Sequence, residues 1–120
     1  MMLRDRLWRA LRVIIDVKLQ TGQLSIARAV ELMMAELGFE RGQAEAEINW
    51  YTSSPTIPLC YATGRELIQH ARDKVVGDSG LSLPEFHNKL LSQGSIALPL
   101  GLQQSFGDTT WQSIHADVFG

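Results

Sequence analysis

The sequence predicts an all-α fold, a single-domain bundle of about five to seven helices over residues 1–120. Apolar residues recur at three- and four-residue steps, and no run alternates with the period of two that is typical of a strand. Proline and glycine clusters divide the chain into helix-length segments. An apolar content of 45% suits a chain that folds around one core, and no repeat or long linker divides it.

The first two predicted helices form a hairpin. Apolar residues from Leu3 to Gln20 follow helical steps with charged residues between them, which predicts an amphipathic helix that ends near Gly22. Ser25 is the expected N-cap of a second helix, and Gly38 stands where a left-handed C-terminal stop is favourable.

Proline marks the boundary between the next two helices. The third helix is expected from about Arg41 to Thr52, because Ser53-Ser54-Pro55 steers the chain away from helix. The fourth is expected to start near Ile57 or Pro58 and to run to about Val76, as the longest buried element.

The best-defined helix start is the capping box Ser82-Leu83-Pro84-Glu85. It predicts a fifth helix that stops at Gly94. A short helix is expected over residues 98–106, and Asp108 is the expected cap of a last one.

Composition gives no sign of a nucleic-acid or membrane partner. The formal net charge is only −2, and the N-terminus has no long apolar run. Cys60 is the only cysteine, so the chain needs no oxidising compartment and a cytoplasmic location is the default. Cys60 is predicted to be a small buried residue. It cannot use His70 as a base, because ten residues of one helix separate them by about 15 Å.

The three histidines predict no metal site within this chain. His70, His87 and His115 are widely spaced and form no His-Glu-x-x-His motif, so surface or core-edge roles are expected for them. Arg4, Arg6, Arg9 and Arg12 give the first helix a basic side. We interpret this basic side as a solvated or salt-bridged surface and not as a nucleic-acid-binding one, because base stacking would need more aromatic residues than Trp8 alone.

Tyr61 and Gly64 lie one helical turn apart, just after the proline-marked helix start. Glycine inside a helix costs about 0.5–1 kcal/mol relative to alanine, so Gly64 is expected to have a spatial reason. Close helix packing and close approach of a substrate both remain open.

The order of several residues resembles a known family. The series contains Arg9 to Asp16, Glu47, Tyr51, Pro55, Tyr61, Gly64, Arg72, Phe86-His87, Leu90-Leu91, Gly94 and Pro99-Leu100. It resembles the C-terminal part of the bacterial domain-of-unknown-function 885 family, whose members are similar to helical zincin metallopeptidases. The resemblance covers about Leu3 to Leu100.

The resemblance implies a site without its metal. In the family, the zinc ligands lie before the region present here, so zinc is implied only for the complete fold and this chain is expected to be inactive alone. Tyr61 would face the cleft and donate a hydrogen bond to a substrate carbonyl or oxyanion. Arg12, Asp16 and Gly64 would belong to the substrate-binding wall, or Arg12 and Asp16 would form a structural ion pair.

The chain departs from the family pattern at three places. Gln20 stands in a histidine position, Trp50 stands where an arginine is usual, and Ile57-Pro58 replaces a Gln-Ala pair. These departures weaken the expectation that substrate contacts are retained.

The alternative is a non-enzymatic helical module for protein interaction or self-association. It is motivated by the number of large apolar side chains, which is more than the core of a small bundle easily buries. These residues are Trp8, Trp50, Trp111, Met33 and Met34. The expected partners are the missing N-terminal peptidase part or a second copy of the chain, with a peptide substrate when the fold is complete.

Overall fold

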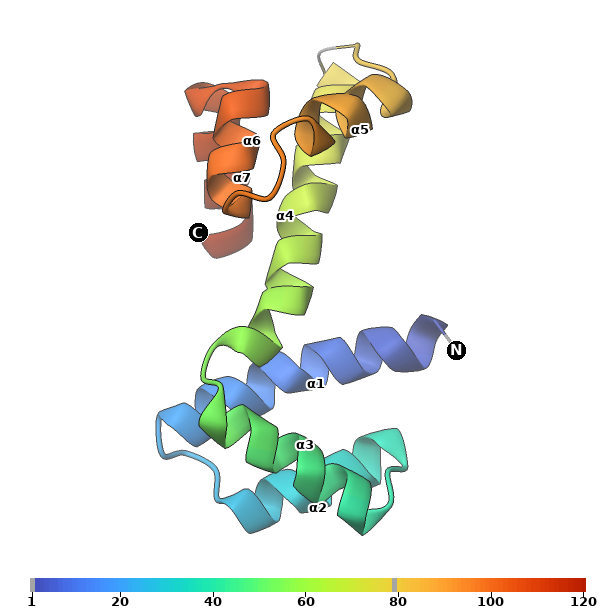
Figure 1. Ribbon diagram of the computed structural model, residues 1–120, viewed down its shortest axis with the longest axis vertical. Coiled ribbons are helices and arrows are strands. Elements are labelled where there is room, and N and C mark those ends of the chain that lie inside the picture. Colours follow the sequence, from blue (N-terminus) through green and yellow to red (C-terminus); the bar gives the residue numbers. More distant parts are fainter. Residues whose placement is uncertain (1, 79) are drawn as a thin grey trace. The chain divides into compact units, whose positions relative to one another are not determined.

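The computed structural model describes residues 2–78 and 80–120, with only the backbone of Asp78. Within these residues the prediction of an all-α fold is confirmed, because they form seven helices and no strand (Figure 1). The helices are α1 (Met2–Gln20), α2 (Ile26–Leu37), α3 (Arg41–Ser53), α4 (Ile57–Asp78), α5 (Leu83–Leu91), α6 (Leu98–Phe106) and α7 (Asp108–Phe119).

The chain divides into two compact units, Met1–Thr63 and Gly64–Gly120, here called the first and second units. Helix α4 begins in the first unit and continues into the second. The prediction of a single domain over residues 1–120 stays a prediction.

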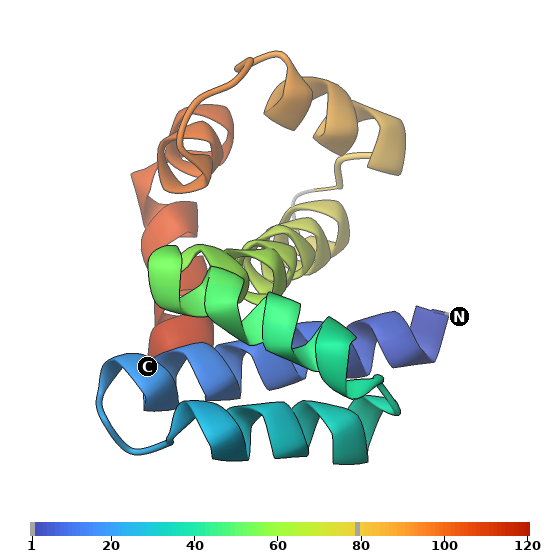
Figure 2. The same ribbon diagram turned by 60° about the horizontal axis from the view of Figure 1, so that its bottom comes forward.

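The first unit is built from α1, α2 and α3, which lie side by side (Figure 2). Its core consists of inward-facing residues of all three helices and of the α2–α3 connection: Leu11, Ile15, Ala29, Val30, Met33, Leu37, Phe39, Ala44, Ile48 and Tyr51. The predicted boundaries of α2 are confirmed. The Ser25 hydroxyl accepts a hydrogen bond from the Arg28 backbone N–H, and Gly38 is left-handed with φ of 66°.

Helix α4 is the longest helix of the described residues, as predicted, but it is not the most buried. Among its side chains from Ile57 to Gly77, only Pro58, Leu67, Ala71 and Val75 are buried. The prediction that Cys60 is buried is wrong, because its side chain is exposed and its thiol donates to the Thr56 carbonyl at 3.2 Å. Pro58 occupies the buried position of the first turn and leaves Cys60 on another side of the helix.

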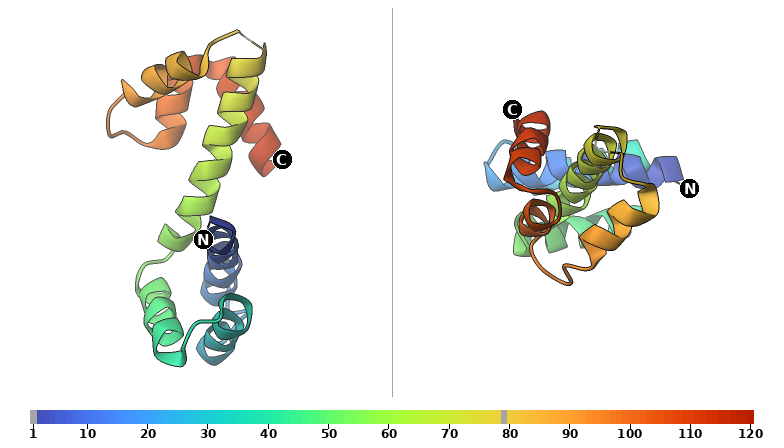
Figure 3. Two further views of the ribbon diagram at one scale, coloured as in Figure 1. Left: turned by 90° about the vertical axis from the view of Figure 1, so that its right-hand side faces the viewer. Right: turned by 90° about the horizontal axis from the view of Figure 1, so that it is seen from above.

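The second unit packs α5, α6 and α7 with the later part of α4 (Figure 3). Its buried core consists of Leu67, Ala71, Val75, Phe86, Leu102 and Ile114. The rings of Phe86 and Phe106 stack with centroids 5.1 Å apart. Both halves of the predicted capping box are present, since Ser82 and Glu85 hydrogen-bond reciprocally at the start of α5.

The start of α7 corrects one sequence prediction. Asp108 is not the cap, because the N-cap is Gly107 and Asp108 already lies in the first helical turn. The Asp108 carboxylate instead accepts a hydrogen bond from Gln103 Nε2 at 2.6 Å. Gly107, with φ of 88°, lets α7 follow α6 directly and shifts the helix start by one residue. None of the helices in the described residues is long and apolar enough to cross a membrane.

The capping box predicts a measurable effect of acid on stability. Hydrogen bonds from the Ser82 hydroxyl and backbone N–H lower the pKa of the Glu85 carboxyl. A lowered folded-state pKa means stabilisation that is present at neutral pH and lost as the pH falls through the folded value. We expect the melting temperature to fall less in Glu85→Gln than in the wild type between about pH 6 and pH 3.

Circular dichroism measures this difference. The matched control is Glu36→Gln, because Glu36 is exposed and makes no hydrogen bond with another described side chain. The control should keep the wild-type pH dependence. An identical dependence in Glu85→Gln would show that the capping carboxylate contributes nothing.

Candidate functional site

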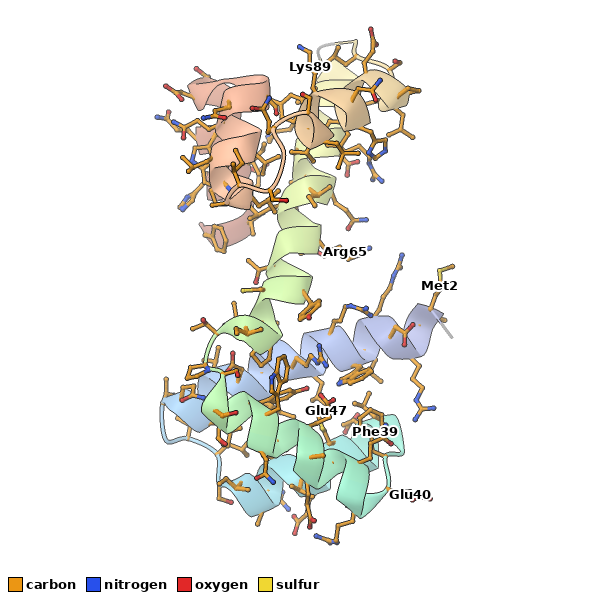
Figure 4. The ribbon with its side chains drawn as sticks, viewed as in Figure 1. Met2, Phe39, Glu40, Glu47, Arg65 and Lys89 are labelled. Carbon is orange, nitrogen blue, oxygen red and sulfur yellow. The ribbon has the colours of Figure 1, made fainter. Side chains whose placement is uncertain are left out.

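Arg12 joins α1 to α3 through two hydrogen bonds. Its Nε donates to the Tyr51 hydroxyl at 2.9 Å, and its Nη2 donates to Glu47 Oε2 at 3.1 Å. Figure 4 shows Glu47 on α3, on the side that faces α1. The Arg12 side chain is only 12% exposed, so this ion pair is shielded from solvent more than an ordinary surface pair.

Tyr51 is a buried phenol whose hydrogen-bonding capacity is used within the first unit. Its hydroxyl accepts from Arg12 and from Trp8 Nε1 at 3.4 Å, and it donates to Glu47 Oε2 at 3.1 Å. Burial raises the pKa of Tyr51 to about 12, with Glu47 adding to the rise while Trp8 and Arg12 oppose it. Tyr51 is therefore a neutral structural group at ordinary pH.

Four aromatic rings surround the Arg12 guanidinium. Its central carbon lies 4.5 Å from the Trp8 ring centroid, 5.2 Å from Tyr61, 5.6 Å from Trp50 and 5.7 Å from Tyr51. These distances lie within the range of cation–π attraction. We call Arg12, Glu47 and these four aromatic residues the arginine cage. Its members come from α1, α3 and the first turns of α4.

Tyr61 is the cage tyrosine with an available donor. Its side chain is 50% exposed, and its hydroxyl makes no hydrogen bond with another described residue. The ring is nevertheless held against the Arg12 guanidinium. The chain has only two tyrosines, so the structure separates a buried, satisfied phenol from an exposed, unsatisfied one.

Asp16 lies one helical turn beyond Arg12 on α1. It is 1% exposed, and neither carboxylate oxygen has a hydrogen-bond partner among the described residues. The alternative of an Arg12–Asp16 ion pair is wrong, because Arg12 reaches across to Glu47 instead. A buried carboxylate without a partner costs stability, which makes Asp16 a marker of function or of an absent donor.

Gly64 belongs to the second unit, where close packing does not require a glycine. A Cβ atom at this position would lie 3.7 Å from Leu98 Cδ2, which is an ordinary contact distance. The packing explanation for Gly64 therefore has no support within its own unit. Close approach of a substrate stays a prediction.

The histidines are dispersed and form no common site. His70 Nδ1 lies 3.9 Å from Asp117, whose carboxylate also binds Lys74 at 2.8 Å. His87 contacts the Phe86 ring, and His115 contacts Trp111 and Phe119. In the described part of the chain, no three His, Cys, Asp or Glu residues could hold a metal ion, so these residues do not fit zinc by themselves.

Sequence reasoning gave no site role to four cage members, namely Trp8, Glu47, Trp50 and Tyr51. One signal for them was available. Trp8 and Arg12 stand four residues apart on α1, as do Glu47 and Tyr51 on α3, so each pair shares a helical face. Gln20 extends this seam, because its Nε2 donates to the Tyr51 carbonyl at 3.2 Å.

A sequence model of the family described as "Bacterial protein of unknown function (DUF885)" matches residues 1–103. The chain belongs to this family. The match includes the whole arginine cage, Asp16 and Gly64, so the candidate site of this DUF885 protein lies within the family region. No curated protein and no solved structure matches the chain.

The raised pKa of Tyr51 can be isolated by one substitution. Tyr61→Phe leaves Tyr51 as the only tyrosine of the chain. We expect its ultraviolet tyrosinate titration to have a midpoint of about 12. Because the folded-state pKa lies above the unfolded value of about 10, the free energy of unfolding should fall as the pH rises from 10 through 12. A midpoint near 10 in folded protein would contradict the buried hydrogen-bonded phenol.

We expect the buried Asp16 side chain to lower the stability of the isolated chain. We expect Asp16→Leu to raise the free energy of unfolding by about 1–3 kcal/mol, since it removes a buried carboxyl group that has no hydrogen-bond partner among the described residues. Asp16→Asn is the matched variant that keeps the shape but leaves a polar amide buried, so its gain in stability should be smaller. Urea denaturation measures both. Loss of stability in both variants would mean that the carboxylate is satisfied in the folded chain.

Proposed function

We propose that this chain is the C-terminal helical portion of a zinc-dependent peptidase-like protein, in which Tyr61 donates a hydrogen bond to a substrate carbonyl or to the tetrahedral oxyanion. The observation that supports the proposal is the state of Tyr61. The residue is half-exposed, its hydroxyl has no acceptor among the described residues, and its ring lies against the Arg12 guanidinium.

Peptide hydrolysis through a tetrahedral oxyanion is favoured by a hydrogen-bond donor that is already in position before the reaction. A fixed donor stabilises charge that develops in the transition state, because the protein does not reorganise at that moment. The Arg12 guanidinium, 5.2 Å from the Tyr61 ring centroid, adds positive potential beside this donor. Glu47 and Tyr51 fix Arg12 in turn, so the cage would act as the rigid support of Tyr61.

The other proposed substrate-binding residues have different access. Only 12% of the Arg12 side chain is exposed, so a substrate carboxylate beside Tyr61 would have to reach it through that small exposed part. Asp16 is almost fully buried, so a substrate contact would need a donor that enters the interior of the first unit. Because glycine has no side chain, the backbone of the second unit at Gly64 would be accessible to a substrate.

Zinc and the peptide substrate would come from outside the described residues. The family resemblance places the zinc ligands before this region, and the proposed partner is that N-terminal peptidase part. The metal would polarise the scissile carbonyl and activate water. A single cysteine that needs no oxidising compartment supports a cytoplasmic location.

Tyr61→Phe tests the proposal in a protein that joins residues 1–120 to the zinc-binding part of the family fold. We expect kcat to fall by about 10²–10³, as for loss of one oxyanion donor, with a much smaller change in KM. The matched control is Cys60→Ser, an exposed neighbour that should keep full activity. An unchanged kcat in Tyr61→Phe would remove Tyr61 from the mechanism.

The isolated 120-residue chain gives a second readout of the same proposal. It should bind no stoichiometric zinc and hydrolyse no peptide, as measured by elemental analysis and a peptide assay. Chelator-sensitive hydrolysis by the isolated chain would overturn the proposal that zinc comes from another part.

A second candidate function is a helical protein-interaction or self-association module. Four of the five residues that first suggested it do not support it, because Met33 is fully buried and Trp8, Met34 and Trp111 pack against the cores. The fifth, Trp50, is 37% exposed. A different set favours it. Helix α1 exposes several large apolar side chains, among them Leu3, Leu7 and Ile14.

A further inference from the structure

Helix α1 has two apolar faces instead of one. The inner face contributes Leu11 and Ile15 to the first core, with Trp8 and Leu19 packed against it. The other apolar face is exposed and consists of Leu3, Leu7, Ala10, Ile14 and Val17, here called the α1 stripe. Leu3 is 79% exposed, Leu7 46%, Ile14 47% and Val17 44%.

The stripe has the geometry of a helix-packing seam. Its residues alternate steps of four and three, which is the a/d spacing of a heptad pattern. On a helix, these positions fall within an arc of about 80° and extend for about 21 Å along the axis. An ordinary surface helix is apolar only toward its own core, so α1 has the pattern of a helix packed on both sides.

The charges beside the stripe are all basic. Arg6 borders one side and Lys18 the other, with Arg4 beyond Lys18, and all three are exposed. None of them forms an ion pair with a described acidic residue, although Arg4 donates to the Leu37 carbonyl. The two acidic residues of α1 lie away from the stripe, since Asp16 is buried and Asp5 is half-buried.

The excess of basic over acidic residues is confined to α1, and the rest of the chain has more acidic than basic residues. Residues 2–20 contain five Lys and Arg against two Asp, whereas the other residues contain six Lys and Arg against eleven Asp and Glu. A partner that matches this surface must combine an apolar seam with acidic flanks.

We propose that the α1 stripe is a docking surface for an acidic amphipathic helix. The apolar side chains of that helix would pack on Leu7, Ala10 and Ile14, and its flanking carboxylates would pair with Arg6 and Lys18. The inference gives a surface and a partner chemistry to the interaction function, on which it rests. It does not depend on Tyr61.

Two other occupants fit the surface less well. A second copy would bring two basic flanks together, with no acidic residue of α1 beside the stripe to compensate. An anionic membrane would attract the basic flanks, but membrane-surface helices have a broad apolar face with Trp or Phe. The stripe is narrow and contains only Leu, Ala, Ile and Val.

Binding of designed peptides tests the proposal directly. The probe is a labelled helix of about 18 residues with Leu and Ile at its a and d positions and Glu at its e and g positions. The comparison peptide has Lys in place of every Glu. Fluorescence anisotropy with the full chain should show at least about tenfold tighter binding of the acidic peptide, and added salt should reduce the difference.

Three exposed-site variants make the result specific to the stripe. Leu7→Ser/Ile14→Ser should lose at least about tenfold in affinity for the acidic peptide. Arg6→Glu/Lys18→Glu should reverse the preference toward the Lys peptide. The matched control is Leu91→Ser, because Leu91 is an exposed leucine of α5, and it should bind like the wild type.

Several outcomes would overturn the inference. Equal binding of both peptides through the stripe would mean that the stripe binds helices without preferring an acidic partner. No binding of either peptide would exclude helix docking. Stronger binding to phosphatidylserine-containing vesicles, removed by Leu7→Ser/Ile14→Ser, would assign the surface to membranes. Self-association that the same variant removes in sedimentation velocity would assign it to a second copy. The Tyr61→Phe variant should bind the acidic peptide normally, so failure here is distinct from failure of the Tyr61 proposal.

Discussion

The Arg12 guanidinium is the group on which the first unit's polar interior depends. It is largely removed from water, so its charge needs both a counterion and polarisable neighbours. Glu47 supplies the counterion, the Tyr51 hydroxyl accepts a second hydrogen bond, and aromatic rings cover its faces. Because these partners come from α1, α3 and the beginning of α4, one charge fixes how three helices meet. Replacing Arg12 by lysine would keep the charge but not the planar fork that binds two acceptors at once.

The cage explains why the two tyrosines have different chemistry. Tyr51 is surrounded by donors and an acceptor, so its proton is committed to Glu47 and its hydroxyl has no capacity left for a ligand. Tyr61 meets the same guanidinium through its ring, and its hydroxyl makes no hydrogen bond with another described residue. The interaction that holds Tyr61 therefore does not consume its donor. This is the combination that a preorganised binding group requires.

The helices could be predicted from the sequence, whereas the site could be predicted only in part. Local signals determine helix ends, so the Ser25 cap, the Gly38 stop and the Ser82–Glu85 box all have the expected geometry. The Arg12–Glu47 pair spans 35 positions, and no local pattern distinguishes Glu47 from Asp16 as the partner of Arg12. The exposure of Cys60 was missed for a related reason, since it depends on which side of α4 meets the rest of the first unit.

Helix α1 combines features that each oppose the stability of the isolated chain. Its inner side buries a carboxylate without a partner, its outer side exposes an apolar seam, and its basic residues include several without counterions. Selection for stability alone would replace such residues by ordinary polar ones on the surface and apolar ones inside. The two sides need different complements, a hydrogen-bond donor for Asp16 and an acidic apolar surface for the stripe. Both deficits lie on the helix that also carries Arg12, so the surface that lacks a partner and the residue that contacts the Tyr61 ring belong to the same element.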